Sequence, residues 1–363
     1  MRHLSIVFFF LLAGCQVATT WEFGPFEKVI EANPILRPSS DYSFVDPISS
    51  TITYFEEKNV LNPSAVVKDG LVHLIYRAQD SLMTSRLALA TSADGIHFEK
   101  AATPILFPEH DAQYEFEWPG GIEDPRVVRL EEGGYYLTYT AYDGKTARLF
   151  AATSPDLIHW EKLGSVFENP KYAEMWSKSG ALVTSQIKDQ FMATKIDGYY
   201  YMYFGDTSLF IARSKDLKSW KVLEDGEKNS PLRVLNPRPG YFDSRLVEPG
   251  PFAVIKPEGI VLIYNASNAR GFNESSLPEF TYAAGQALFD SSEPWKLLDR
   301  TPTHFITPET EFEKVGEVDQ VVFAEGFIYF KEKYFLYYGT ADSNIGVAVS
   351  QWGKSFSDSF LFR

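Results

Sequence analysis

Residues 123–162 contain four short apolar runs that are separated by turn residues. The runs read Asp124-Pro125-Arg126-Val127-Val128, Tyr135-Tyr136-Leu137-Thr138-Tyr139-Thr140-Ala141, Ala147-Arg148-Leu149-Phe150-Ala151-Ala152-Thr153-Ser154 and His159-Trp160-Glu161-Lys162. Short runs rich in aromatic and β-branched residues, bounded by Gly, Asp and Pro, are typical of β-strands. The stretch therefore predicts four consecutive strands joined by turns.

The same order of runs occurs five times along the chain. One unit precedes this stretch and starts at Asn62, and three follow it, starting at Ser179, Glu248 and Asp319. The last unit is expected to finish with residues 352–356. A tyrosine recurs at a nearly constant spacing in the second run of every unit: Tyr76, Tyr139, Tyr203, Tyr264 and Tyr338.

Five units of one four-stranded pattern predict an all-β fold, a five-bladed β-propeller. Radial repetition leaves only short, protected sheet edges, which limits the aggregation of an all-β chain. A β-sandwich is the alternative. It does not explain why successive units share endings such as Ala-Thr-Ser in the third run and Trp-Glu-Lys in the fourth.

The N-terminus has the features of an export signal. A basic start, Met1-Arg2-His3, precedes an apolar run over residues 6–12, which is too short to span a bilayer as a stable helix. The following Leu12-Ala13-Gly14-Cys15 resembles a bacterial lipobox, so residues 1–14 are predicted to be removed and Cys15 to be lipidated. An ordinary signal peptide with an incidental cysteine is the alternative. Residues 15–50 then form an anchor segment, and residues 51–363 the propeller domain.

The composition of the chain argues against some classes of binding partner. The chain has 363 residues, is 45% hydrophobic and 15% aromatic, and carries a formal net charge of −14. Phosphate binding needs clustered Lys and Arg, so this charge argues against nucleic acid. Cys15 is the only cysteine, which excludes a disulfide within the chain. Membrane contact is expected only through the N-terminal lipid.

The segment Gly120-Gly121-Ile122-Glu123-Asp124-Pro125-Arg126 concentrates charge at the start of a predicted strand. The glycines permit a tight turn, and Pro125 is expected to push Asp124 toward an extended conformation. This is a suitable position from which to aim a carboxylate. A structural ion pair in a turn is the alternative.

In a propeller the first strand of each unit lines the central channel, so the residues that begin these strands form a ring. All are polar: Asn62, Asp124, Ser179 with Lys178 before it, Glu248 and Asp319. A second ring follows the matched tyrosines and contains Arg77, Thr140, residues 204–206, Asn265 and residues 339–342. Carboxylates and cations that converge on one concavity suit acid and base chemistry on a sugar.

These residues carry a family resemblance. The Gly120–Arg126 segment, Tyr76-Arg77-Ala78, Ser85-Arg86 and the closing Tyr337-Tyr338-Gly339-Thr340-Ala341-Asp342 resemble glycoside hydrolase family 130, the β-mannoside phosphorylases and β-mannosidases. The resemblance implies a five-bladed propeller, β-mannoside substrates, inversion at the anomeric carbon and no metal or other cofactor. It makes Asp124 the proton donor, acting through the 3-hydroxyl of the sugar.

Three departures from the phosphorylase pattern favour hydrolysis. Asn265 stands where those enzymes have a phosphate-binding histidine, Glu248 introduces a carboxylate, and Asp206 follows the third tyrosine where a His-Arg pair is usual. Fewer cations and more carboxylates disfavour a phosphate dianion and allow a water to be polarised. An exported location, periplasmic or at the cell surface, agrees with this.

The sequence thus predicts an inverting exo-β-mannosidase that acts on β-1,2-mannosides. Asp124 is the expected acid and Glu248 the base, with Asp206 assisting. A phosphorylase and a non-catalytic glycan-binding lipoprotein are the alternatives, while arabinanases and fructosidases would need an aspartate at Asn62. The residues expected to bind substrate are Asn62, Arg77, Arg86, Glu123, Arg126, Tyr142, Lys178, Asn265, Asp319 and Asp342.

Overall fold

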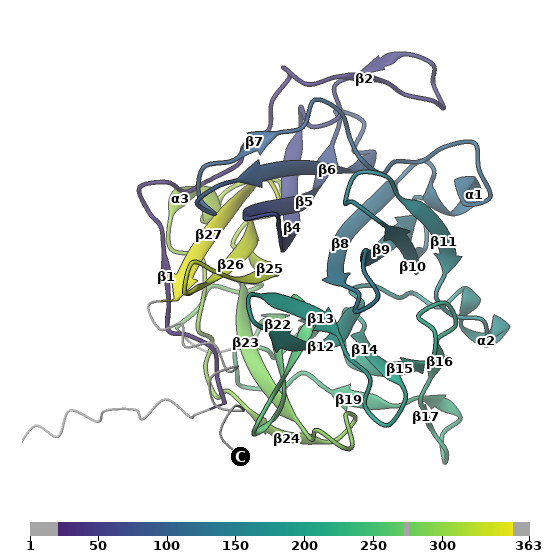
Figure 1. The fold of residues 1–363 in the computed structure, drawn as a ribbon. Helices are drawn as coiled ribbons and strands as arrows, with labels where there is room; N and C mark the ends of the chain where they lie inside the picture. Colours follow the sequence, from purple (N-terminus) through teal and green to yellow (C-terminus); the bar gives the residue numbers. More distant parts are fainter. Residues whose placement is uncertain (1–20, 272–275, 351–363) are drawn as a thin grey trace, which may run out of the picture.

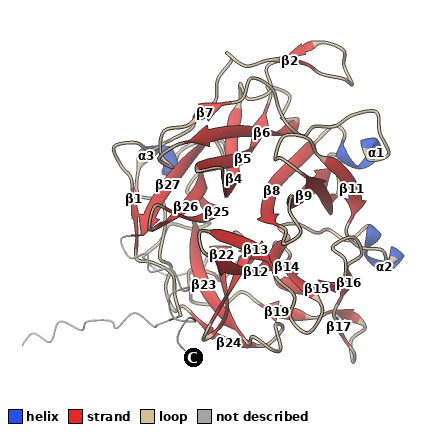
Figure 2. Cartoon of the chain, in the orientation of Figure 1, coloured by secondary structure: helices blue, strands red, loops and turns tan. Residues whose placement is uncertain are grey.

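A computed structural model of the chain describes residues 21–271 and 276–350. The prediction of an all-β chain is confirmed, and Figure 2 shows strands throughout with a few short helices. In the described part of the chain the helices are single turns, α1 (Tyr114–Glu117), α2 (Pro170–Ala173) and α3 (Glu311–Lys314), and none could cross a membrane. The predicted signal sequence, Cys15 and residues 352–356 lie outside the described residues.

The strands of each predicted unit pair antiparallel with one another, and each of these groups is called a sheet below. The first contains β4 (Asn59–Lys68), β5 (Leu71–Gln79), β6 (Ser85–Ser92) and β7 (Glu99–Lys100). The second contains β8 (Gly121–Arg129), β9 (Tyr135–Tyr142), β10 (Ala147–Ser154) and β11 (Glu161–Ser165). The third contains β12 (Ala181–Ile187), β14 (Tyr200–Phe204), β15 (Leu209–Ser214) and β16 (Lys221–Val222).

The inner strand of the fourth sheet is split in two. That sheet contains β20 (Leu246–Pro249), β21 (Ala253–Lys256), β22 (Gly259–Ser267), β23 (Tyr282–Phe289) and β24 (Leu297–Arg300). The fifth contains β25 (Val322–Phe330), β26 (Lys333–Thr340), β27 (Asn344–Ser350) and β1 (Phe26–Lys28). Smaller strands lie in the connections: β2 (Phe44–Val45), β3 (Ile52–Thr53), β13 (Gln190–Ala193), β17 (Glu224–Asp225), β18 (Ser230–Pro231) and β19 (Arg233–Leu235).

Figure 1 shows the sheets following one another around a common centre in chain order. The hydrophobic core lies between neighbouring sheets. Ile75 and Leu87 of the first sheet, for example, pack in one buried cluster with Ile122 and Leu137 of the second. Each fully buried aliphatic side chain of this kind contributes roughly 1.5–3 kcal/mol. The alternating apolar positions of every unit therefore hold adjacent sheets together.

The N-terminal strand β1 belongs to the fifth sheet. It pairs with β27, with Phe26 opposite Ser350, and so supplies the outer strand of the fifth sheet. Folded structure therefore includes residues before 51, and residues 26–28 pair along the outer edge of β27. An outer edge left open on the last sheet would expose unpaired backbone groups, which explains why the chain start returns to cover it.

The matched tyrosines have a common packing role. All five are fully buried. Tyr76 donates a hydrogen bond to Glu56 at 2.7 Å and Tyr139 donates to Glu117 at 2.8 Å, in each case a carboxylate from the segment before the unit. Tyr338 donates to Glu313 at 3.0 Å in the same way. A buried phenol needs such a partner, and in these three units the pairing fixes the second strand to the segment before it, whereas Tyr203 donates to Pro294 O at 2.7 Å.

Candidate active site

The inner strands of the first two sheets carry matching bulges at Asn62 and Asp124. The register of β4 shifts between Leu61 and Ser64, and that of β8 between Glu123 and Arg126. Asn62 has φ 47° and Asp124 has φ 50°, the left-handed region, so the extended conformation predicted for Asp124 is wrong. Proline follows each and cannot donate to the sheet, which favours a bulge, and Asn and Asp tolerate positive φ better than other residues.

The bulges turn these two side chains toward each other. Asn62 donates from Nδ2 to Asp124 Oδ1 at 2.8 Å, and both residues are buried. Gly121 is required directly beside them, because a Cβ there would lie 2.1 Å from the carbonyl oxygen of Ser85. The sequence motif thus places Asp124 at the inner end of the second sheet, in contact with the first.

Two cationic side chains lie close to the neighbouring carboxylates of Glu123 and Asp124. Arg77 of β5 donates from Nη1 to Asp124 at 3.2 Å and from Nη2 to Glu123 at 2.6 Å. Lys178 places Nζ 3.9 Å from Asp124 and 4.0 Å from Glu123. Burial by itself would raise the pKa of Asp124, but Arg77 and Lys178 outweigh burial and lower it to about 2. Burial raises the pKa of Glu123 in spite of the same cations.

Glu248 lies on β20, opposite Asn265 of β22. Its carboxylate is buried and accepts a short hydrogen bond from the Ser179 hydroxyl. Burial raises the pKa of Glu248 to about 7, although Lys178 and Arg126 act in the opposite direction. Within one site, therefore, one carboxylate is ionised and another holds a proton near neutrality, the arrangement expected of an acid and base pair.

These side chains surround a cavity of about 170 Å³. Six residues predicted from the sequence line it. Tyr282 and three apolar side chains, none of them predicted from the sequence, complete it. The full lining consists of Asn62, Arg77, Asp124, Lys178, Glu248, Asp342, Tyr282, Val318, Val321 and Phe323.

Arg126 lies behind the cavity and connects the second sheet to the fourth. It donates from Nε to Gly250 O and from Nη2 to Pro249 O, both at 2.8 Å, and from Nη1 to Asp124 O at 3.2 Å. Because Pro249 follows Glu248, these bonds set the position of Glu248 relative to Asp124. Arg126 therefore positions the site rather than lining it.

Glu325 is a buried carboxylate that the sequence analysis missed. It lies in a bulge of β25, and its Oε2 is 3.6 Å from Arg126 Nη2. Neither of its oxygens has a hydrogen-bond partner among the described residues, and burial raises its pKa well above the usual range. A signal was present, since Glu325 interrupts the apolar run from Val321 to Phe327. The predicted ring position, Asp319, instead lies in an exposed loop before β25.

Other predicted residues have structural partners outside the cavity. Arg86 is buried between Asp46, at 2.7 Å, and Asp80, at 2.8 Å. Asn265 exchanges two hydrogen bonds with the backbone of Ala324, which ties the fourth sheet to the fifth. Asp206 accepts a hydrogen bond from Trp176 Nε1 at 2.6 Å, and Tyr142 packs edge-on against the same Trp176 ring.

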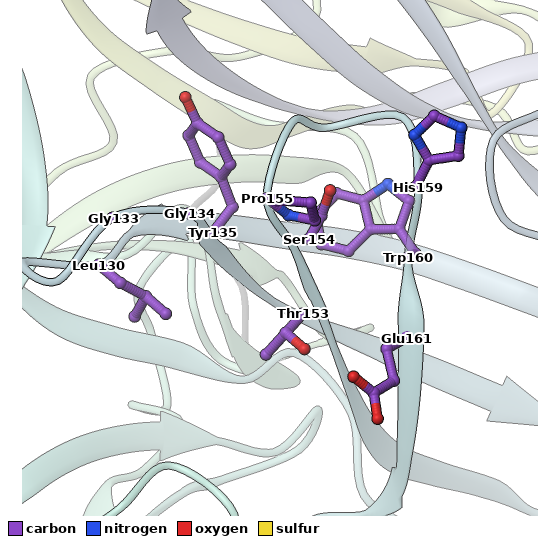
Figure 3. A pocket seen from close by; sticks show the side chains of 10 residues that line it. All are labelled: Leu130, Gly133, Gly134, Tyr135, Thr153, Ser154, Pro155, His159, Trp160 and Glu161. Atoms are coloured by element: carbon purple, nitrogen blue, oxygen red, sulfur yellow. The ribbon is translucent and has the colours of Figure 1, made fainter.

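A larger cavity of about 520 Å³ lies at the opposite ends of the strands, beside the turn that joins β8 to β9. Figure 3 shows its lining, in which the His159 ring lies at the upper right of the view and the Glu161 carboxylate lies below it. The His159 imidazole is already engaged by Asp156 at 2.7 Å. This cavity has no cluster of facing carboxylates and cations, so the smaller one is the candidate active site.

Comparison with known proteins identifies relatives of one family. A sequence model of glycoside hydrolase family 130, described as beta-1,4-mannooligosaccharide phosphorylase, matches residues 26–354. The chain is 30% identical over 333 residues to a 1,2-beta-oligomannan phosphorylase from Thermoanaerobacter sp. (strain X514), which covers 89% of this chain and 96% of that protein.

Solved structures agree with the sequence match. One, from a study described as "The GH130 family of mannoside phosphorylases contains glycoside hydrolases that target beta-1,2 mannosidic linkages in Candida mannan", superposes with a TM-score of 0.90 at 39% identity, over 93% of this chain and 98% of that chain. A glycosyl hydrolase from Bacteroides ovatus superposes with a TM-score of 0.88 at 40% identity, over 91% and 94% of the two chains.

Proposed function

The chain belongs to glycoside hydrolase family 130, and from this premise we propose that it is an inverting, exo-acting β-mannosidase that hydrolyses β-1,2-linked mannooligosaccharides. The observation that carries the proposal is Glu248. It is a buried carboxylate in the same cavity as Asp124, held by Ser179, with a pKa near neutrality. An inverting hydrolase needs a base of this kind to activate water, whereas a phosphorylase does not.

The charge of the cavity supports water rather than phosphate as the attacking group. Its lining contains two cations, Arg77 and Lys178, and three carboxylates, Asp124, Glu248 and Asp342. Both cations lie within 4.0 Å of the Glu123 and Asp124 carboxylates, so neither is free to bind a dianion. A phosphate dianion would meet repulsion here, while a neutral water would not.

The size of the cavity supports action at a chain end. At about 170 Å³ it is small compared with the usual 300–1,000 Å³ of a ligand pocket and suits about one sugar ring. Its lining comes from several sheets and includes the apolar Val321 and Phe323. A terminal mannose can occupy such a space, and the remainder of an oligosaccharide must then lie outside.

In this proposal the two carboxylates divide the chemistry of inversion. Asp124 supplies a proton toward the departing oxygen, and Glu248 takes one from the attacking water. These roles require Asp124 to be protonated and Glu248 to be ionised. Without substrate the pKa values favour the opposite, at about 2 for Asp124 and about 7 for Glu248. A bound mannoside must therefore shift the proton between them. A water or sugar hydroxyl that donates to Glu248 favours its ionised form, and hydroxyls that compete for Arg77 weaken the hold on Asp124.

Product analysis tests the function directly. β-1,2-Mannobiose is incubated with the protein in ¹⁸O-labelled water, with and without inorganic phosphate. We expect free mannose of inverted configuration that carries the label at the anomeric carbon, at a rate that phosphate does not increase. Mannose 1-phosphate as the product would overturn the hydrolase proposal in favour of a phosphorylase.

We also infer the architecture and location in finer detail. The five sheets are blades of a β-propeller, in which the ends of the inner strands β4, β8 and β20 meet at the catalytic cavity. The lipobox-like Leu12-Ala13-Gly14-Cys15 supports an exported lipoprotein anchored through Cys15.

A further inference from the structure

Trp176 is an exposed aromatic side chain close to Lys178, a residue that lines the catalytic cavity. It lies in the loop between α2 and β12, two residues before Lys178, and 47% of its surface is exposed. The next residue, Ser177, is buried and is held by two hydrogen bonds to β10. Its backbone N–H donates to Ala147 O and its side-chain Oγ accepts from Leu149 N, each at 3.0 Å. The loop is therefore held in place while it presents a large apolar ring to solvent.

The orientation of this ring is fixed by two neighbours. Trp176 Nε1 donates to Asp206 Oδ2 at 2.6 Å, a charge-assisted hydrogen bond. Tyr142 packs against the ring edge-on, with centroids 6.5 Å apart and an interplanar angle of 73°. An exposed ring pinned in this way loses little conformational entropy when something binds to its face.

A short chain of contacts connects the ring to the catalytic carboxylate. Lys178 Nζ lies 6.0 Å from the centre of the Trp176 ring and 3.9 Å from Asp124 Oδ2. Lys178 lines the cavity, whereas Trp176 does not. The ring thus lies next to a residue that lines the cavity, one side chain away from the proton donor.

We propose that Trp176 is a binding platform for the sugar on the leaving side of the cleaved linkage, with Asp206 and Tyr142 as positioning residues for the ring. This rests on the proposed function, because a cavity of about 170 Å³ accommodates one sugar and leaves the next one outside. The C–H face of a pyranose is apolar and packs against an aromatic face, while its hydroxyls remain in water. The same geometry gives Asp206 a role distinct from that of a catalytic base, since its carboxylate is engaged with the indole.

Kinetics on β-1,2-mannobiose test the platform. Trp176→Ala removes the ring and is expected to raise KM roughly tenfold, the size of a lost aromatic contact, with little change in kcat. Asp206→Ala frees the ring and is expected to shift KM in the same direction by less. Trp160→Phe, at the far cavity of Figure 3, serves as the matched control and should leave both constants unchanged. An unchanged KM in Trp176→Ala, or a loss confined to kcat, would overturn the proposal.

A binding measurement separates the platform from the reaction. Calorimetric titration with β-1,2-mannobiose compares Glu248→Gln with the double variant Glu248→Gln/Trp176→Ala, neither of which needs to turn over substrate. Weaker binding by the double variant supports the platform even if product analysis identifies a phosphorylase. Equal affinity of the two variants overturns the platform while leaving the hydrolase proposal intact.

Discussion

Lys28 donates from Nζ to Glu313 Oε2 at 2.9 Å, so a residue near the start of the described chain holds a carboxylate of the segment just before the last unit. The pair has counterparts in Lys100 with Glu56, at 2.7 Å, and Lys162 with Glu117, at 2.6 Å. In the first two sheets the lysine belongs to the unit's own fourth strand, β7 or β11, whereas in the fifth sheet it comes from β1. The contact therefore identifies β1 as the fourth strand that closes the ring of sheets.

Removing this lysine should destabilise the whole fold. The side chains of Lys28 and Glu313 are 6% and 0% exposed, so Lys28→Met leaves a buried charge without its partner and is expected to cost about 3–5 kcal/mol in the free energy of unfolding. Urea denaturation measures this. Lys58→Ala, which removes an exposed pair with Glu317, is the control and should change stability by less than about 1 kcal/mol. A Lys28→Met variant as stable as the control would contradict the closing role of β1.

Asp124→Asn tests the proton donor. General acid catalysis typically contributes about 10²- to 10⁴-fold, so mannobiose hydrolysis should fall by that factor, while a mannoside with an activated aryl leaving group should lose much less. Initial rates on the two substrates provide the comparison. Equal losses on both would assign Asp124 a structural role, or the role of base.

Glu248→Gln should abolish hydrolysis and yet stabilise the fold at alkaline pH. The folded-state pKa of about 7 exceeds the ordinary value of 4.5, so wild-type stability falls as the pH rises from about 4.5 to 7, and the cost persists above 7. Glutamine carries no such cost, and its advantage should be on the order of 1–3 kcal/mol at pH 8 and should vanish near pH 4. Thermal unfolding at the two pH values measures this. Near wild-type hydrolysis by the variant would remove Glu248 from the mechanism.

The pH dependence of kcat/KM should show loss of activity above pH 7. The mechanism needs one proton shared by Asp124 and Glu248. In the free enzyme this proton is on Glu248, whose pKa burial raises to about 7. We expect a plateau on the acid side and a tenfold decline per pH unit well above 7, in rates measured on mannobiose. Activity that keeps increasing through pH 8 would show that the reactive state carries no such proton.

Cys15→Ala tests the anchor. Because the first described strand begins at Phe26, the change should release the protein from the membrane fraction without affecting hydrolysis. Fractionation of cells that express each form, followed by an activity assay, gives the answer. A variant that stays in the membrane fraction would exclude a lipid on Cys15 as the anchor.

The amino-acid sequence by itself determined the strands and their fivefold recurrence. Strand formation depends on local properties, namely β-branched and aromatic runs bounded by turn residues, and those are visible in residues 123–162. The motif around Asp124 also identified the family and most of the polar lining of the cavity. Asn62, Arg77 and Lys178 could be predicted because each lies at a fixed place in the repeated pattern, beside the start of a first strand or directly after a matched tyrosine.

Only the tertiary structure decided which distant segments meet and what their charges do. The pairing of β1 with β27 joins residues more than 300 positions apart, as the bond from Asn33 to Val347 also does. The left-handed bulge at Asp124, the buried Glu325 and the hold of Asp206 on Trp176 likewise depend on neighbours from other sheets. Charge interactions depend on distance and desolvation depends on burial, and a sequence pattern gives neither quantity. The lower pKa of Asp124 and the higher pKa of Glu248 therefore follow only from the folded arrangement of the sheets.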